Sequence, residues 1–479
     1  MRVLFLAAEA APLVKVGGLG DVAGSLPRAL AALGHDVRVA MPDATRVEDS
    51  GFAPRLLARY PVPTASGAEE AAASEVDAAG IRFLLVGGAP IPRNGRVYGS
   101  SIAEDGPKFA FFSRAALELC RALRWEPDVV HCHDSHAAPA AAWLSAHGST
   151  DPVFRATASL VTIHNLPYMA TGAGAALAAY DIPVDGEGLP DWARGGLLPV
   201  GLAHADEIST VSPTYAREIQ TPEFGAGLDG FLRSRADRLT GILNGIDLSV
   251  WDPARDPALP RAYDAARLDA RRDDRAALQK ELGLDPDPDA TIVGIVSRLE
   301  WQKGFDVAAP ALGRWLESGG QLAAIGHGDP GIEALLAGLS EKHPSRAGIR
   351  FGFHAALARR IYAGVDLFLI PSRYEPCGLT QMIAMRYGAV PVARRTGGLA
   401  DTIRDAAAPD GTGFLFDALD PEAVTGALER ARALRRRPAE WDALVLRGMG
   451  TDFSWTRPAR AYSALYERAR LRRREEVAR

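Results

Sequence analysis

The chain has 479 residues, too many for one ordinary hydrophobic core, so its length predicts two domains. Its 47% hydrophobic and 24% charged residues are typical of a soluble globular protein, and the net charge of −5 gives no reason to expect a nucleic-acid partner. No apolar run is long enough to span a bilayer, and three cysteines fit a reducing cytoplasm better than a disulfide framework.

The first 40 residues predict a βαβ unit with a glycine-rich first loop. An apolar strand over residues 2–8 precedes the loop KVGGLGD at 15–21, and a helix to about Leu33 leads to a second strand at 35–40. The glycines come too late after the strand for a dinucleotide fingerprint. A flexible loop carrying Lys15 suits a departing diphosphate, although a solvated lysine would look the same. Residues 43–80 predict a hairpin or loop insertion, followed by a strand at 81–86.

Two strands of the first half end in histidines. One ends in HCHDSH at residues 131–136, a pattern that suits either a metal cluster or histidines that bond locally. We favour local bonding, because the surrounding βα repeats differ from the β-sandwich in which a similar motif holds zinc. The strand at 159–163 leads into His164 and Asn165, where His164 could bond sugar hydroxyls or simply cap the strand. Residues 241–247 are predicted as the last strand of this half.

The second half restarts the strand–helix alternation after a linker rich in proline and aspartate at residues 251–260. The acidic run DPDPD at 285–289 is interpreted as an exposed turn rather than a metal site. A strand at 291–296 is followed by Arg298 and Lys303, two cations that suit an anion, and we expect Lys303 to be exposed in the free protein. GHGDPG at 326–331 follows a strand with the spacing of a dinucleotide loop, so a nicotinamide-dependent oxidoreductase is the alternative function.

The stretch from 366 to 403 organises the second half. Apolar strands at 366–370 and 389–393 each run into a glycine-bearing loop, and each loop opens a helix. Free N–H groups at a helix start favour phosphate, so both loops predict diphosphate contacts. The carboxylate of Glu375, in the first loop, can accept hydrogen bonds from sugar hydroxyls.

The last helix has one apolar face formed by Tyr462, Leu465, Tyr466 and Ala469. Its arginine-rich end, residues 468–479, is interpreted as a solvated helix end because glutamates are interspersed with the arginines.

Three motifs, EPCGLT at 375–380, RTGGLADT at 395–402 and KVGGLGDV at 15–22, together resemble the bacterial glycogen synthase and plant starch synthase family. They lie far apart in the chain but in the family's order. The resemblance implies an α/β fold of the GT-B type, with two Rossmann-like βα-repeat domains facing across a deep cleft. It places the N-terminal domain at 1–250, the C-terminal nucleotide-sugar domain at 251–457, and a helix at 458–479 that crosses back onto the first domain.

The family's activity is the retaining transfer of glucose from ADP-glucose to the non-reducing 4-hydroxyl of an α-1,4-glucan such as glycogen. The resemblance implies this hexosyltransferase activity here, without a metal or other cofactor and without a membrane or nucleic-acid partner. The remaining alternative is a glucan-binding relative that has lost catalysis, which the absence of the cations or of Glu375 would favour; all are present.

The resemblance also assigns roles residue by residue. It implies catalytic roles for Glu375, Arg298, Lys303 and His164. It implies donor binding by Lys15, Gly18, Asp21, Asn244, Arg298, Lys303, Phe353, Glu375, Cys377, Gly378, Leu379, Thr380, Gly397 and Gly398. It implies acceptor or sugar contacts by Tyr98, Asp134, His164 and Asn165. The chain departs from the family pattern in places: Ser135 replaces a tryptophan, Phe353 replaces the usual tyrosine that packs on the adenine, Arg194 stands where the family often has lysine, and the loop between Arg93 and Gly106 is shorter than usual.

Overall fold

The computed structural model describes residues 1–93 and 95–478. The chain divides into two compact units, unit 1 with Met1–Gly245 and Ser454–Arg479, and unit 2 with Ile246–Phe453. Within the described ranges, none of the helices combines the length and the apolar character that crossing a bilayer requires.

Unit 1 is built on a sheet that, over the described residues, has nine strands in the order β3-β4-β5-β2-β1-β6-β7-β8-β9. Its strands are β1 (Arg2–Leu6), β2 (Asp36–Pro42), β3 (Arg55–Thr64), β4 (Gly67–Ala78), β5 (Ile81–Gly88), β6 (Val129–His133), β7 (Ala158–Ile163), β8 (Glu207–Thr210) and β9 (Leu239–Gly241). From β5 to β9 all neighbours pair in parallel, whereas β3, β4 and β5 pair antiparallel. The hairpin predicted within residues 43–80 is therefore confirmed.

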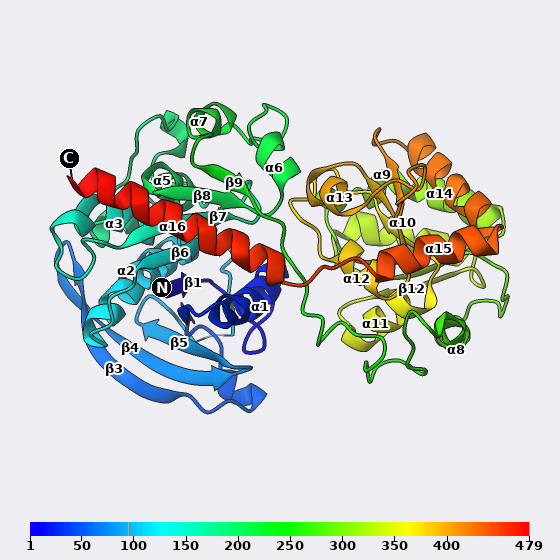
Figure 1. The fold of residues 1–479 in the computed structure, drawn as a ribbon, viewed down its shortest axis with the longest axis horizontal. Coiled ribbons are helices and arrows are strands. Elements are labelled where there is room, and N and C mark those ends of the chain that lie inside the picture. The colour runs from blue at the N-terminus through cyan, green and yellow to red at the C-terminus, as the bar shows by residue number, and fades with distance from the viewer. Residues whose placement is uncertain (94, 479) are drawn as a thin grey trace. The chain divides into compact units, whose positions relative to one another are not determined.

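Helices cover this sheet. They are α1 (Gly18–Ala32), α2 (Ile102–Ala122), α3 (Pro139–His147), α4 (Gly174–Ala179), α5 (Leu197–His204), α6 (Pro213–Glu218), α7 (Asp229–Ser234) and α16 (Thr456–Ala478). Figure 1 shows α16, in red, running across the sheet of unit 1. Tyr462, Leu465, Tyr466 and Ala469 are at most 3% exposed, and the two tyrosines and Leu465 belong to one core cluster with β1 and α1, so the predicted apolar face is confirmed.

The arginine-rich end of α16 is not simply solvated, which corrects the sequence interpretation. The carboxylate of Glu207, at the start of β8, is fully buried and lies 2.6 Å from Arg468 and 2.6 Å from Arg472. Two guanidinium groups neutralise this buried charge, which would otherwise be costly. The pairing spans more than 260 residues of sequence, so the local charge pattern could not reveal it.

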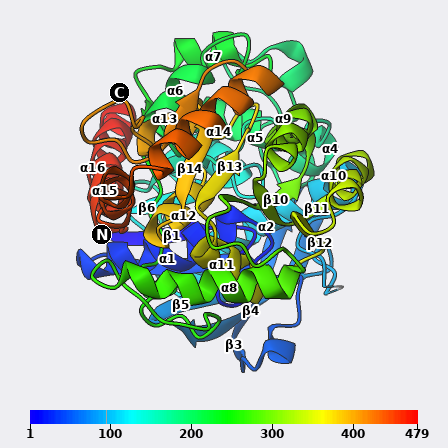
Figure 2. The same cartoon turned by 90° about the vertical axis from the view of Figure 1, so that its right-hand side faces the viewer.

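Unit 2 contains a parallel sheet, six-stranded in the described residues, with the order β12-β11-β10-β13-β14-β15. Its strands are β10 (Ile292–Leu299), β11 (Gln321–Gly328), β12 (Ala347–Phe351), β13 (Leu367–Ile370), β14 (Val390–Arg394) and β15 (Phe414–Phe416). Its helices, seen from one side in Figure 2, are α8 (Arg271–Leu282), α9 (Phe305–Glu317), α10 (Pro330–Lys342), α11 (Ala355–Gly364), α12 (Thr380–Arg386), α13 (Gly397–Thr402), α14 (Pro421–Arg435) and α15 (Pro438–Met449). Apolar runs flanked by helices again give strands buried on both faces.

The strand predicted at 241–247 is wrong, because β9 ends at Gly241. A Cβ at Gly241 would lie 2.3 Å from the carbonyl oxygen of Ser212, so the chain is already in tight contact there. Beyond it, the amide of Ile246 donates to the carbonyl of Phe453 at 2.8 Å, a contact that belongs to unit 2. The chain therefore leaves the first sheet earlier than its apolar residues indicate.

The dinucleotide-like motif at 326–331 does not form a loop behind a strand. Gly326 and Gly328 are the last part of β11 itself and pair with Ser297 and Leu299 of β10. A Cβ at Gly328 would lie 2.4 Å from the carbonyl oxygen of Leu299. These glycines thus serve close strand packing, and the feature that suggested a nicotinamide enzyme is absent.

Candidate active site

Two loops of unit 2 are locked together at the carboxyl ends of β13 and β14. These strands are parallel neighbours, so their ends bring residues 371–379 and 395–398 to one sheet edge. The amide of Gly398 donates to the carbonyl of Glu375 at 3.0 Å. Gly397 has φ +44°, and a Cβ there would lie 1.9 Å from the same carbonyl oxygen. The glycine pair therefore holds the backbone of Glu375 by contacts that no side chain permits.

The side chains of Lys303 and Glu375 form an ion pair at this edge. Lys303 Nζ lies 2.7 Å from Glu375 Oε2, and the two side chains are 17% and 9% exposed. The hydroxyl of Ser372 donates to the same carboxylate oxygen at 2.9 Å. Gly304, with φ +71°, brings the lysine loop against Pro371, because a Cβ there would lie 2.1 Å from that residue's carbonyl oxygen. Lys303 is thus mostly buried, and the expectation that it is exposed is wrong.

Arg298 is the exposed cation of this region. It lies in β10, its side chain is 53% exposed, and it lies 2.6 Å from the carboxylate of Glu300. An exposed pair of this kind contributes little to stability, so the guanidinium can be recruited by an anion at small cost. Arg298 and Lys303 flank a turn that ends in the αL residue Gly304.

The expectation of free amide groups at two helix starts fails for α13. This helix has six residues, and the amide of Gly398 is already bonded to the loop of Glu375. Helix α12 has seven residues, and its first turn starts at Thr380, directly after Gly378 and Leu379. The amide of Ile383 donates to the carbonyl of Leu379 at 3.0 Å, so the amides of 380–382 precede the helical hydrogen bonds and remain suited to an anion.

Three further predicted donor contacts differ in exposure. Phe353 lies between β12 and α11 and is 89% exposed, so its ring face is accessible to a base. Cys377 is 5% exposed, with its thiol in the protein interior. Asn244 is 6% exposed, and its side-chain oxygen has no hydrogen-bond partner among the described residues. A buried unpaired acceptor of this kind is available to a ligand donor.

In unit 1, the glycine-rich loop is held by Glu9, a residue that the sequence analysis missed. Its carboxylate accepts hydrogen bonds from the amides of Val16 and Gly17, the latter at 3.0 Å, and from the hydroxyl of Tyr98 at 2.9 Å. Glu9 is 2% exposed, and it is an acidic residue within an apolar run that follows β1. That isolated buried carboxylate was the available signal.

Lys15 and Asp21 lie on the same loop and first helical turn. Lys15 Nζ is 2.7 Å from Asp21 Oδ1, and α1 begins at Gly18 between them. The lysine is 44% exposed, so its charge stays accessible to solvent and to an anion. Tyr98, predicted to contact the acceptor, bonds Glu9 and lies against the ring of His136, with centroids 4.9 Å apart, and its acceptor contact stays a prediction.

The histidine-bearing ends of β6 and β7 lie side by side. His133 and His164 are joined by a hydrogen bond of 2.8 Å, and His131 is bonded to Tyr466 and Thr162 at 2.8 and 2.7 Å. The described residues contain no group of side chains that could hold a metal ion. His131 and His133 thus have local hydrogen-bond partners, whereas Nδ1 of His136 has none among the described residues.

Asp134 lies at the same edge of the sheet, directly after β6. It has φ +55°, and its carboxylate accepts from the amide of His164 at 2.7 Å. Burial raises its pKa to about 7, although the amides of His164 and Asn165 act in the opposite direction. Burial lowers the pKa of His164 to about 3, so its ring is neutral at physiological pH. Asn165 lies next to His164 at the same strand end.

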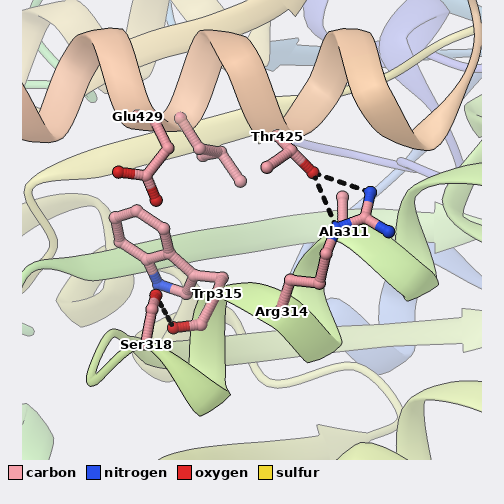
Figure 3. Close-up of a pocket in the computed structure, with 7 residues that line it drawn as sticks. Ala311, Arg314, Trp315, Ser318, Thr425 and Glu429 are labelled. Carbon is pink, nitrogen blue, oxygen red and sulfur yellow. Dashed lines mark hydrogen bonds between the residues drawn. The ribbon is translucent and has the colours of Figure 1, made fainter.

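A small cavity elsewhere in unit 2 contains none of these residues. Figure 3 shows it between α9 and α14, where the Arg314 guanidinium bonds Thr425 at 2.8 Å and Trp315 lines the opposite side. Its volume is about 170 Å³. It is distinct from the sheet edge that carries Glu375 and Lys303.

Two α/β units with largely parallel sheets and polar carboxyl-end loops match the architecture of the GT-B class of glycosyltransferases. A likeness in fold alone links the chain to the sucrose-phosphate synthase of Thermosynechococcus elongatus, with a TM-score of 0.62, 19% identity and 98% of each chain covered. The catalytic domain of starch synthase IV from Arabidopsis thaliana, bound to ADP and acarbose, superposes with a TM-score of 0.90 and 33% identity over 98% of this chain and 99% of that one.

Sequence comparisons identify the family. The starch synthase catalytic domain model matches residues 2–234, and the glycosyl transferases group 1 model matches residues 290–433. Glycogen synthase of Gloeobacter violaceus is 43% identical over 476 residues, 98% of either chain. Glycogen synthase of Moorella thermoacetica is 40% identical over 483 residues, 99% of this chain and 98% of that one. The chain belongs to the glycogen synthase and starch synthase family and is a glycosyltransferase.

Proposed function

We propose that this enzyme transfers glucose from ADP-glucose to the non-reducing 4-hydroxyl of an α-1,4-glucan, with retention at the anomeric carbon, and so elongates glycogen. The relatives named glycogen synthase support the reaction, and the ADP and acarbose in the starch synthase IV structure support the donor and acceptor classes. The observation that carries the proposal is the ion pair of Lys303 and Glu375 at a glycine-locked sheet edge.

The chemistry requires a cationic environment for the departing diphosphate. The bond between the anomeric carbon and the diphosphate oxygen breaks, and the bond to the acceptor 4-oxygen forms on the same face of the sugar. The acceptor proton passes to the departing diphosphate. Arg298 and Lys303, with Lys15 of unit 1, stabilise the negative charge that develops on the diphosphate.

Hydroxyl groups of the transferred glucose are the partners we assign to Glu375, on unit 2, and to His164, on unit 1. Glu375 already accepts from Ser372 and Lys303, which fixes the orientation of its carboxylate. His164 is neutral because burial lowers its pKa, so it contacts the sugar without adding charge. Phe353, exposed and aromatic, is assigned to the adenine, and Asp134, Asn165 and Tyr98 to the sugar and acceptor side.

The test is incorporation of radiolabel into glycogen by the purified chain, with ADP-glucose and UDP-glucose as parallel donors. We expect ADP-glucose to label the glycogen. An exo-acting enzyme that cleaves α-1,4 bonds from non-reducing ends should then release this label from the glycogen. We expect transfer to persist in excess chelator, because side-chain cations are available to neutralise the diphosphate. Loss of transfer in chelator that a divalent ion restores would contradict this charge assignment.

Other outcomes decide between the remaining functions. Preference for UDP-glucose over ADP-glucose would change the assigned donor, whereas glycogen binding without label transfer would indicate a glucan-binding relative that has lost catalysis. For any variant of Lys303, the matched control is Lys342→Ala, which removes an exposed lysine of α10 in unit 2 and should leave transfer unchanged.

A further inference from the structure

The hydrogen bond between His133 and His164 requires one of two proton arrangements. It joins Nδ1 of His133 to Nε2 of His164 at 2.8 Å. Burial lowers the pKa of His133 well below the ordinary value and that of His164 to about 3, so both rings are neutral. Each neutral imidazole carries one N–H, and therefore one ring donates and the other accepts.

The surroundings of His133 decide which ring donates. His133 is fully buried, with the Phe5 and His131 rings each 4.0 Å from its own. Its second nitrogen, Nε2, has no hydrogen-bond partner among the described residues. If His164 donated, His133 would carry its proton on Nε2 and bury an unpaired N–H donor, at a cost of about 1–3 kcal/mol. Donation by His133 Nδ1–H leaves only an unpaired lone pair there, which is the smaller penalty.

We propose that His133 is a positioning residue that fixes His164 as the tautomer protonated on Nδ1, so that His164 presents an N–H donor to a hydroxyl oxygen of the transferred sugar. Nε2 of His164 is occupied as the acceptor of the His133 hydrogen bond, which leaves Nδ1 for the substrate. The amide of His164 is also fixed, because it donates to Asp134 at 2.7 Å. Ring and backbone are thus both held before substrate arrives, which favours a preorganised contact.

The tautomer is a property of the free enzyme, whereas its use on a sugar rests on the proposed function. It also gives His133 a specific chemical role within the HCHDSH motif. His131 on the same strand has both ring nitrogens bonded, to Tyr466 and Thr162, and anchors α16 instead. Two histidines two residues apart on β6 therefore serve different purposes.

The direct test is ¹⁵N NMR of the histidine-labelled full chain without substrate. We expect a pyrrole-type Nδ1 and a pyridine-type Nε2 for both His133 and His164, assigned by the signals lost in His133→Asn and His164→Gln. A pyrrole-type Nε2 on His164 would overturn the proposal. In His133→Leu the acceptor bond is lost, so His164 should shift toward the Nε2–H form, whereas His133→Asn keeps an N–H near the original Nδ1 and should preserve the tautomer.

Kinetics test the functional half. We expect His133→Leu to lower kcat about ten- to a hundredfold with little change in the donor KM, and His133→Asn to recover most of the loss. His204→Gln is the control, because His204 of α5 bonds the carbonyl of Asp185 at 2.8 Å and should affect neither signal nor rate. If the NMR tautomer is as expected but His133→Leu has normal kcat, the positioning role is contradicted. If wild-type enzyme transfers no glucose at all, the proposed function fails while the tautomer assignment stands.

Discussion

The two units carry polar groups at the carboxyl ends of their strands, but they handle charge in opposite ways. In unit 2, Lys303 and Glu375 are paired at 2.7 Å, and Arg298 of β10 is exposed. In unit 1, the ends of β6 and β7 carry histidines that burial keeps neutral, and burial also raises the pKa of Asp134 to about 7. One edge is suited to a diphosphate and the other to uncharged hydroxyl groups, which is the division that sugar transfer from a nucleotide requires.

The largest expected effect is on the charged edge. Lys303→Ala removes a positioned cation whose contact strengthens as the diphosphate leaves, so kcat/KM should fall by about two to four orders of magnitude. Because Lys303 is mostly buried against Glu375, the variant should also lose about 1–3 kcal/mol of unfolding free energy. Transfer assays and urea unfolding measure both. Normal turnover in this variant would show that the Lys303–Glu375 pair has only a structural role. The charged edge of unit 2 would then not differ in function from the neutral edge of unit 1.

The second effect concerns the glycine lock behind that edge. Gly397→Ala places a Cβ 1.9 Å from the carbonyl oxygen of Glu375, at φ +44°, so the loops must separate. We expect a loss of about 3 kcal/mol in the unfolding transition of unit 2, with loss of transfer. Gly426→Ala in α14 is the control, since nothing lies within 4 Å of its Cβ position and helix propensity should make it neutral or stabilising. Equal unfolding free energies for the two variants would show that Gly397 does not hold the two loops together.

A third change measures how much two arginines stabilise a buried carboxylate of unit 1 that lies away from the histidine edge. Replacing Arg468 and Arg472 together by alanine leaves the buried Glu207, at the start of β8, without a cation. We expect a loss of about 2 kcal/mol, less than for a fully buried pair because both arginines are partly exposed. The paired control replaces Arg457 and Arg474, exposed residues of the same helix. A melting temperature that falls equally in both double variants would argue against the Glu207 anchor.

A fourth effect is a pH dependence of stability. Asp134 has a folded-state pKa of about 7, above the roughly 3.9 of an exposed aspartate, so the folded state binds more protons between those values. Its contribution to the unfolding free energy therefore falls as pH rises from about 4 to about 7 and is level above that range.

Asp134→Asn removes this titration and keeps an acceptor for the amide of His164, and asparagine tolerates φ +55°. Relative to wild type, the variant should gain unfolding free energy between pH 5 and pH 7, by at most about 1.4 kcal/mol per pH unit. Urea titrations at several pH values measure this, with the exposed Asp77→Asn as control. A difference that is constant with pH would contradict the raised pKa.

The sequence predicted the strands that lead to the site residues, because apolar runs and the glycines that end helices are local signals. It correctly placed Glu375 and Gly398 at the ends of neighbouring strands. It could not show that Lys303 pairs with Glu375, 72 residues away, or that two arginines neutralise Glu207. Such pairings depend on the folded arrangement, which explains why Lys303 was expected to be exposed.

The roles of the glycines were the hardest to predict from the sequence. GHGDPG matched a dinucleotide loop by spacing, but its first two glycines lie within β11, where neighbouring backbone leaves no room for a Cβ. An acidic residue within an apolar run was the available signal for Glu9, but its partners, two backbone amides of the next loop and the hydroxyl of Tyr98, emerge only in the fold. Spacing alone does not say whether a glycine faces a ligand or another strand.

We expect diphosphate recognition to depend on the Lys303 edge of unit 2 and not on the histidine edge of unit 1. The most direct measurement is calorimetric titration of ADP into wild-type enzyme, Lys303→Ala and His164→Ala at two salt concentrations. We expect ADP affinity to fall at least tenfold in Lys303→Ala, with weaker salt dependence, and to stay within about twofold of wild type in His164→Ala. Equal losses in both variants, or unchanged affinity in Lys303→Ala, would show that Lys303 is not the specific contact for the diphosphate.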